Sequence, residues 1–449
     1  MNQNLSKIAA RSLMVFIASM VFASTATAGS KETVLHNFNT LSGGLFPVGG
    51  LIADASGNLY GVTPLGGIGK AAHGYGTIFE LTPGSKGWTQ KVLYRFAGGT
   101  DGIGLDEHLI FDQAGNLYGA TEGGGQYKFG TIFKLTPQNG SWTKTTIHSF
   151  NGTDGNNPSG PLIFDQAGNL YSECAQGGEH ADGSIFELSP PAQPGDSWTE
   201  TTLHSFGSET ANHDGAWPNG GLVLDQKGNL FGTTSYGGTT TEIKKCNYAG
   251  CGVVFELSPP SQKGNPWTET VLHNFTSGTD GANPESGMIF HQGNLYGTTA
   301  NGGTKGWLGL GAVFEMSPGK GGDWTETIIY RFPPNNNDGR PEEVVWGLTA
   351  DQAGNLYGTT VGGYGKGCPY AQCGTVYELK PPASKGTPWT ERTLFQFSGL
   401  DGIEPAGSLL LSNSGILYGE TEYGGAKGKY CTQIHGSVDG CGTVFQIIP

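Results

Sequence analysis

The chain has little positive charge, and arginine is especially scarce. It contains 24 Lys and Arg against 38 Asp and Glu, which gives a formal net charge of −14. Binding to a nucleic-acid backbone relies on clustered Lys and Arg, so this composition argues against a nucleic-acid ligand. Only four arginines follow residue 28, which argues equally against the arginine cluster of a sialidase-like site.

Several sequence signatures of enzymes and of helical folds are also missing. The sequence has no G-x-S-x-G nucleophile elbow and no G-x-x-x-x-G-K-[ST] phosphate loop. No segment beyond the N-terminal region keeps a 3.6-residue periodicity. An enzyme that cleaves glycosides with two carboxylates from distant segments would show no local motif, so this class of enzyme stays open.

Long apolar runs are absent except near the N-terminus. Lys7 and Arg11 precede an apolar stretch over Ser12–Ser24, and Ala26-Thr27-Ala28 follows as a small-x-small site. This pattern predicts a signal peptide over residues 1–28, cleaved after Ala28, and therefore a secreted or periplasmic protein. No other run reaches the roughly 18 residues of a membrane helix, and we expect no anchor at the C-terminal end.

A seven-residue motif occurs seven times. It reads GNLFGTT at Gly228, and close copies begin at Gly57, Gly115, Gly168, Gly293, Gly354 and Gly415. These copies define units 1 to 7. Each unit has four short β-branched or aromatic segments bounded by Gly, Pro, Asn and Asp, which is the signature of strands. We name these strands A to D, and the motif supplies the A–B turn and strand B.

The repeat predicts an all-β fold, a seven-bladed β-propeller of four-stranded blades. Unit 7 stops after strand C, whereas residues 31–38 read as a strand D without its unit. We therefore expect 31–38 to pair with 443–448, complete the last blade and close the ring. Residues 29–449 would then form one domain.

The repeat resembles a known family. GNLYGTT, a following GG, a GT-x-FEL segment and WTET-x-LHSF are similar to the GloVer tandem repeat of exported bacterial proteins, described with a "choice-of-anchor" C-terminus. The resemblance covers about the whole mature chain and implies export and a β-propeller-like array. It implies no established activity and no catalytic residues. A weaker resemblance is to kelch blades.

Six of the seven cysteines form pairs with short spacing between the GG and strand C. The pairs are Cys246–Cys251, Cys368–Cys373 and Cys431–Cys441. In an exported chain this arrangement predicts three local disulfides, which is favoured over zinc because the pairs lie in different units. Cys174 is left over and is expected to be an inert buried thiol.

Two repeated polar residues are interpreted as structural. His36, His148, His204 and His273 share a position that other units fill with Tyr or Phe, so a flat packing ring is expected there. An Asp-Gly pair before Pro recurs between strands D and A. Its spacing lacks the alternating oxygen ligands of a calcium loop, so we predict turns and no metal site.

The B–C loops are the first candidate binding face, because they vary in length on a constant scaffold. They carry eight Lys and four Asp or Glu, whereas the rest of the mature chain is acidic. Aromatic rings suit stacking on sugars, and lysine suits anionic groups. The candidates are Trp307, Tyr75, Tyr127, Tyr248, Tyr364, Tyr370, Tyr430, Lys427 and Lys429; ordinary solvated loops are the alternative.

The start of strand A, at the expected channel mouth, is the second candidate site. Its usual residue is Gly, but units 2 and 6 depart from the repeat and Glu285 and Glu404 fall nearby. Such acidic side chains would hold a cation or serve as general acid and base in catalysis; the alternative is that they are ordinary exposed residues. The residues concerned are Asp106, Glu107, His108, Glu342, Glu343 and Trp346.

The sequence therefore predicts an exported propeller that binds glycan or cell-envelope material through its B–C loop face. One alternative is a polysaccharide lyase or glycoside hydrolase acting at the channel mouth. Another is a kelch-like scaffold for protein interactions. We expect a monomer without cofactor.

Overall fold

The computed structural model describes most of the chain after the N-terminal region. The described residues are 30–67, 73–105, 108–193, 195–207, 214–239, 246, 250–262, 264–303, 310–332, 347–362, 373–384, 386–428, 431 and 440–449. The predicted signal peptide lies outside them. Within them the fold is all-β, with short 3-10 turns η1 (Leu41–Gly43) and η2 (Gly99–Asp101).

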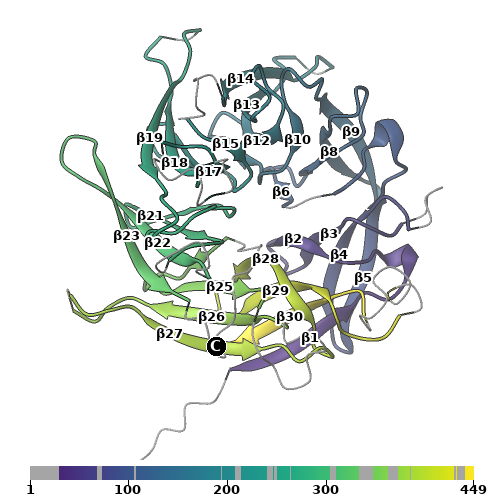
Figure 1. Cartoon of the computed structure of the whole chain (residues 1–449). Coiled ribbons are helices and arrows are strands. Elements are labelled where there is room, and N and C mark those ends of the chain that lie inside the picture. The colour runs from purple at the N-terminus through teal and green to yellow at the C-terminus, as the bar shows by residue number, and fades with distance from the viewer. Residues whose placement is uncertain are drawn as a thin grey trace, which may run out of the picture.

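The described strands form six sheets, which Figure 1 shows arranged around a common centre as in a propeller. The largest sheet has the order β1 (Lys31–Asn37), β30 (Thr443–Ile448), β29 (Leu417–Tyr423), β28 (Ile403–Leu411), β2 (Val48–Ala53), β3 (Leu59–Thr63), β4 (Thr77–Gly84) and β5 (Gly87–Arg95). Its two halves, units 7 and 1, are joined by one parallel bridge between Gly50 and Ser408.

Three sheets have four strands each and belong to units 2, 5 and 6. Unit 2 holds β6 (Ile110–Phe111), β7 (Leu117–Thr121), β8 (Thr131–Gln138) and β9 (Ser141–Ser149). Unit 5 holds β20 (Ile289–His291), β21 (Asn294–Thr299), β22 (Ala312–Pro318) and β23 (Trp324–Arg331). Unit 6 holds β24 (Thr349–Ala350), β25 (Leu356–Thr360), β26 (Thr375–Lys380) and β27 (Thr390–Gln396).

The sheets of units 3 and 4 have five strands, because strand A is split in two. Unit 3 holds β10 (Asn156–Pro158), β11 (Ile163–Phe164), β12 (Leu170–Gln176), β13 (Ser184–Ser189) and β14 (Thr199–Ser205). Unit 4 holds β15 (Ala216–Pro218), β16 (Val223–Leu224), β17 (Leu230–Tyr236), β18 (Val253–Ser258) and β19 (Thr268–Asn274). The expectation of seven separate four-stranded sheets is thus met in part.

The split lies where strand A approaches the centre of the molecule. In units 1 and 7 strand A is continuous but shifts register there, between Val48 and Ile52 in β2 and between Ala406 and Leu410 in β28. A Cβ atom on Gly50 would lie 2.9 Å from the main-chain oxygen of Ser408. Close approach of neighbouring units therefore favours glycine at this position and interrupts the regular pairing.

The two chain ends meet in the largest sheet. β1 pairs antiparallel with β30, from Lys31 opposite Ile448 to Asn37 opposite Thr443. The main-chain N–H of Phe38 also donates to the oxygen of Gly442 over 3.0 Å. Figure 1 shows this N-terminal strand lying along the C-terminal one. The segment 31–38 thus supplies strand D to unit 7.

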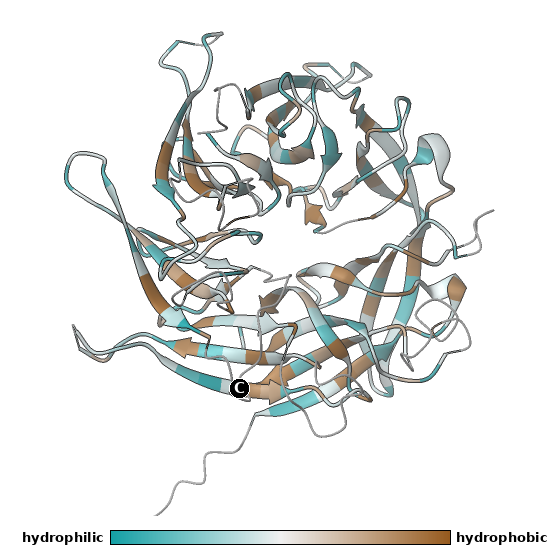
Figure 2. Cartoon of the chain, in the orientation of Figure 1, coloured by the Kyte–Doolittle hydropathy of each residue, from teal (hydrophilic) through white to brown (hydrophobic). Residues whose placement is uncertain are grey.

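Burial explains why the strands differ in sequence. Strand B and the first part of strand C are mostly buried because neighbouring units cover both of their faces; β3 shows no exposed residue, and β4 is exposed only over its last three residues. Strand D alternates between exposed and half-buried residues, as in β9, because it forms the outer edge. Figure 2 shows apolar residues concentrated along the strands and hydrophilic ones in the connections.

Aromatic rings connect each unit to the next. The closing Phe of strand D packs in a T-shaped arrangement on the central ring of strand C in the following unit, with ring centroids 5.0–5.4 Å apart. The pairs are Phe96–Phe133, Phe150–Phe186, Phe206–Phe255, Phe275–Phe314, Phe332–Tyr377, Phe397–Phe445 and Phe38–Phe79. The last pair joins unit 7 to unit 1. These rings form the core between units.

The repeated motif builds a hydrogen-bonded A–B turn. In unit 2 the carboxylate of Asp112 accepts from Ala114 N and Asn116 N at 2.9 Å, from Asn116 Nδ2 at 2.6 Å and from Tyr118 OH at 3.1 Å. Partial burial alone would raise the pKa of Asp112, but these donors hold the pKa below its ordinary value. The Tyr ring also packs against the Trp of the next unit, as in Tyr118–Trp198.

Candidate functional site

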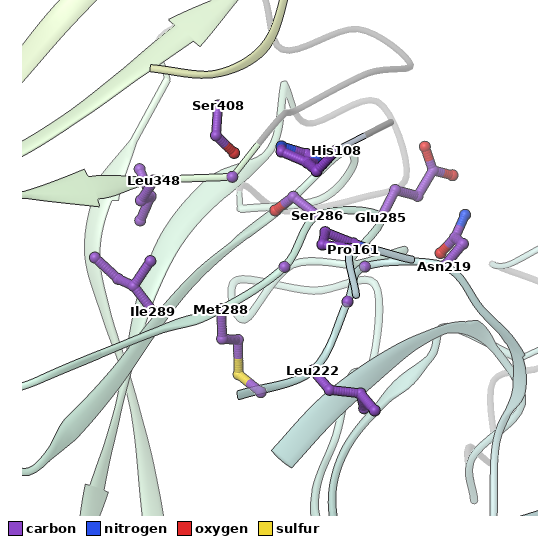
Figure 3. A pocket seen from close by; sticks show the side chains of 14 residues that line it. His108, Pro161, Asn219, Leu222, Glu285, Ser286, Met288, Ile289, Leu348 and Ser408 are labelled. Atoms are coloured by element: carbon purple, nitrogen blue, oxygen red, sulfur yellow. The ribbon is translucent and has the colours of Figure 1, made fainter. Parts of the chain in front are cut away.

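A cavity of about 240 Å³ lies where the inner ends of several strands A meet (Figure 3). We call it the axial cavity. Its polar lining includes His108, Asn219, Glu285, Ser286 and Ser408, and its apolar lining includes Leu222, Met288, Ile289 and Leu348. Glycines of units 4, 5 and 6 complete the wall. Residues of units 2 to 7 thus contribute to one concave surface.

His108 takes the position where four other units carry glycine. Its Nε2 lies 3.1 Å from the point that a Cβ on Gly50 would occupy, so the ring lies against unit 1. Enclosure by the strands lowers the pKa of His108 to about 4, even though its ring lines the cavity and keeps some exposed surface. His108 is therefore neutral near pH 7 and offers the cavity an uncharged hydrogen-bonding ring.

Two buried carboxyl groups hold neighbouring units together near the cavity. Glu173 accepts a hydrogen bond from Gly221 N, and Glu420 accepts one from Gly50 N over 3.2 Å. Both occupy the sixth position of the motif, and both are fully buried. Burial raises the pKa of Glu173 to about 8 and that of Glu420 well above its ordinary value. The repeat puts Thr233 at this position in unit 4, where it donates to Ser286 O over 3.4 Å.

A polar network forms the rim of the cavity at units 4 and 5. Ser235 Oγ donates to Asn219 Oδ1 over 2.8 Å, and Asn283 Nδ2 donates to Ser235 O over 2.8 Å. Figure 3 shows Asn219 and Glu285 side by side at one end of the cavity. The network fixes the amide of Asn219 before any ligand is bound.

Trp217 comes two residues before Asn219 in the chain and is 42% exposed. Its ring packs edge-on against Tyr236, with centroids 5.6 Å apart and an interplanar angle of 89°. Its main-chain N–H donates to Asp182 O in the B–C loop of unit 3 over 2.8 Å. Burial raises the pKa of Tyr236, and the charge of Glu285 adds to the shift.

Trp217 has a left-handed backbone conformation, with φ of 58°. The residue before the equivalent Pro is left-handed in other units as well, at Phe46, Asn157, Asn283 and Glu404. The conformation is therefore a property of the repeat, whereas the exposed indole is particular to unit 4. Sequence reasoning missed Trp217; the D-G-A-W-P segment, with Trp where Asn or Glu also occurs, was the available signal.

The predicted loop candidates fall into two groups. Tyr75 is half-buried and lies against Gly98, as a packing ring does, whereas Tyr127 is 49% exposed and Lys427 is exposed. These three come from units 1, 2 and 7. The other candidates lie outside the described residues: Trp307, Tyr248, Tyr364, Tyr370, Tyr430 and Lys429.

Most of the predicted channel-mouth residues also lie outside the described part of the chain. They are Asp106, Glu107, Glu342, Glu343 and Trp346. His108 lies in the axial cavity. Burial raises the pKa of Glu404 to about 7, with a further contribution from the charge of Glu422. In the described residues no three His, Cys, Asp or Glu side chains gather as a metal site would need.

The repeated His and Asp residues contact each other within the D–A turns. His148 Nε2 lies 3.2 Å from Asp154 Oδ2, and its ring packs edge-on against Phe150. Asp154 also accepts from Asn151 N over 2.8 Å. The ring contact agrees with a packing role, and the carboxylate serves the turn.

The cysteines of the loop face are bonded locally. Cys246 is bonded to Cys251, and Cys431 is bonded to Cys441. Cys373 is also disulfide-bonded, and its predicted partner Cys368 lies outside the described residues. Cys174 is a free and buried thiol, and burial raises its pKa well above the ordinary value.

A model of the Gloeobacter/Verrucomicrobia repeat matches the chain over residues 10–244, 70–307 and 244–434. None of the curated proteins matches it in sequence. Among the described residues, none of the helices is long and apolar enough to cross a membrane.

Solved structures with a similar course of the chain include three proteins that carry enzyme names. A protein named as an oxidoreductase (glucose dehydrogenase), from Thermus thermophilus, is matched over 94% of this chain and 100% of its own length, at 14% identity and a TM-score of 0.44. A gluconolactonase from Xanthomonas campestris is matched over 73% of this chain and 86% of its own length, at 14% identity and a TM-score of 0.39. A luciferin-regenerating enzyme is matched over 78% of this chain and 92% of its own length, at 14% identity and a TM-score of 0.42. Similarity at this level indicates no activity.

Proposed function

The chain belongs to the Gloeobacter/Verrucomicrobia repeat family, and we propose that it is an exported, seven-bladed β-propeller that binds glycan at the rim of the axial cavity. Trp217 is the stacking platform, and Asn219 and Glu285 supply hydrogen bonds. The observation that carries the proposal is the exposed indole of Trp217, two residues before Asn219 of this fixed polar rim.

Support for the closed ring comes from contacts that link each unit to the next and the last unit to the first. The seven T-shaped aromatic pairs run from each unit to the next, and Phe38–Phe79 links unit 7 back to unit 1. The pairing of β1 with β30 gives unit 7 its fourth strand. A ring closed in this way leaves no long unpaired edge, which favours a monomer of one domain over residues 29–449.

Support for export comes from residues 1–28 and from the disulfides. The positive, apolar and small-residue segments have the order of a signal peptide. The bonds Cys246–Cys251 and Cys431–Cys441 persist in an oxidising compartment, such as the periplasm or the exterior.

Support for a glycan comes from the chemistry of the rim. A sugar presents one apolar face and a rim of hydroxyl groups. An indole held edge-on by Tyr236 offers a rigid flat surface for the apolar face. Asn219 and Glu285 offer the donor and acceptor groups that fix an orientation. This site lies at the end of the sheets that carries the D–A and B–C loops, as the contact between Trp217 and Asp182 indicates.

A glycan array with the mature chain, followed by calorimetric titration of the best ligand, tests the proposal. Trp217→Ala should weaken binding about 10- to 100-fold, since a central aromatic anchor contributes roughly 2 kcal/mol or more. Leu400→Ala is the matched control, because Leu400 is also an exposed apolar residue in a D–A loop, 77% exposed, but in another unit. Equal affinity of the Trp217→Ala variant and the wild type would overturn the site.

A reducing-end release assay on the same ligand separates binding from catalysis. The proposal predicts no release above that of a heat-denatured sample. Release that depends on His108 or Glu285 would replace the binding function by a hydrolase or lyase at the cavity.

A further inference from the structure

The A–B turns lie at the end of the sheets opposite to the D–A and B–C loops, because successive strands of a meander run antiparallel. Two grooves lie between neighbouring turns on this end. One, of about 430 Å³, lies between the turns of units 2 and 3, and the other, of about 670 Å³, between those of units 6 and 7. We call this end the A–B face.

Each groove is lined by one carboxamide side chain from each of its two turns. The first has Gln113 and Gln166, and the second has Gln352 and Asn413. All four residues are exposed. The hydrogen bonds of the turn are made by Asp, Asn and main-chain groups, as Asp112 shows, so the turn itself does not need these amides.

The carboxamide recurs around the molecule. The residue after the turn Asp, or after its replacement, is an exposed Gln or Asn in six of the seven units: Gln113, Gln166, Gln226, Gln292, Gln352 and Asn413. Unit 1 carries Ala55 in a turn with the same hydrogen bonds, from Ser56 N and Asn58 N to Asp54. The fold therefore accepts alanine at this position, and an amide in six units requires another explanation.

Beside its amides, the first groove is lined by aromatic rings and by turn carboxylates that already accept hydrogen bonds. Half-buried Phe111 and Phe164 line the first groove, and T-shaped contacts with Tyr60 and Tyr118 fix their rings. The carboxylate of Asp112 is occupied by donors of its own turn, and Lys134 Nζ lies 3.9 Å from it. Rigid rings with paired amides suit a neutral, hydroxyl-rich ligand.

We propose that the A–B face binds neutral polysaccharide, with one sugar unit held by the two carboxamides of each inter-turn groove. Single amide–hydroxyl contacts are weak, but several grooves on one ring engage one polymer at a high effective concentration. The inference concerns the face opposite to Trp217 and does not depend on the glycan site proposed there.

Affinity electrophoresis of the full mature chain tests this inference. The probes are native gels containing amylopectin or hydroxyethyl cellulose, with polygalacturonate as an acidic comparison. Neutral polymer should slow the wild type, and the Gln113→Ala/Gln166→Ala variant should bind about five- to tenfold more weakly. Replacing all six carboxamides by Ala should weaken the retardation further, below that of the double variant. The melting temperature should stay unchanged, because unit 1 already carries Ala55.

Ala55→Gln is the matched gain-of-function variant, since it adds a seventh carboxamide to the ring. It should strengthen retardation by roughly twofold or more, which a purely structural role of the amides would not produce. Retardation that is equal in the wild type and the six-Ala variant overturns the inference. Loss of retardation on Trp217→Ala alone also overturns it, while supporting the other site.

Discussion

The two ends of the propeller-like array differ in what the repeat holds constant. On the A–B face one turn recurs with the same Asp acceptor and the same hydrogen bonds, for example at Asp54 and Asp351. On the loop face the B–C connections vary in length and carry the disulfides, and the contact between Trp217 and Tyr236 occurs in unit 4. A repeat thus builds a uniform surface on one end and an irregular one on the other.

Removing residues 31–38 should have the largest effect, because both faces rest on the sheet that joins the two chain ends. The deletion exposes β30 as an edge and removes Phe38 from its contact with Phe79. We expect aggregation, or a melting temperature lowered by more than about 10 °C. Light scattering and calorimetry measure these outcomes. Unchanged melting and solubility would contradict the role of β1.

Asp112→Ala tests how much the constant turn contributes. The substitution removes an acceptor of four hydrogen bonds, so unfolding should become easier by on the order of 2–3 kcal/mol. Asp225→Ala should cost less, because unit 4 has Phe231 in place of Tyr and Asp225 accepts three bonds. Denaturant unfolding measures both variants. If the two variants lose the same free energy of unfolding, or none, the hydrogen bond from Tyr118 to Asp112 does not contribute to the stability of the turn.

Glu173→Gln tests the buried carboxyl near the axial cavity through pH. The folded pKa is raised to about 8, above the ordinary value of 4.5, so the protonated form stabilises the fold. That stability is fully present below about 4.5 and is lost as pH rises through 8. Gln keeps an acceptor for Gly221 N but does not ionise. The melting temperature of the variant minus that of the wild type should therefore increase from pH 5 to pH 9.

The control for this prediction is Thr233→Ser, which alters the same motif position in unit 4, where the side chain does not ionise. It should leave the pH dependence of melting as it is in the wild type. Parallel pH curves for Glu173→Gln and the wild type would show that Glu173 keeps the same protonation state in the folded and unfolded chain.

Lys427→Glu should have the smallest effect and compares the two faces by charge. If an anionic glycan binds the loop face, this substitution should weaken it by no more than about 1 kcal/mol, and less at high salt. Lys227→Glu is the control, because Lys227 is an exposed residue in the A–B turn of unit 4. Titrations at two salt concentrations measure both. An equal effect of the two variants would assign the attraction to net charge alone.

The strands and their order could be predicted from the sequence, because the repeat restates the same pattern of Gly, Asn and aromatic residues in every unit. The pairing of 31–38 with 443–448 followed from a strand D missing at one end and present at the other. The split of strand A in units 3 and 4 could not be predicted from the sequence. It arises from contact between units at the centre, such as Gly50 with Ser408, and sequence periodicity contains no information on that distance.

The candidate site was less predictable than the fold for a physical reason. Trp217 is one of nine Trp, and although its place before Pro218 sets it apart from the Trp of strand D, its exposure and its contact with Tyr236 were visible only in the structure. Tyr75 shows the reverse, since a loop aromatic expected to face a ligand lies against Gly98. Whether a ring packs or binds depends on its neighbours in space, which residue type and loop position do not determine.

Hydrogen–deuterium exchange with and without the glycan selected on the array tests the central claim most directly. We predict slower exchange in peptides covering residues 214–222 and 231–239, which carry Trp217, Asn219 and Tyr236. Bound glycan that leaves residues 214–239 unprotected would contradict the account, because the ligand would then occupy another part of the propeller.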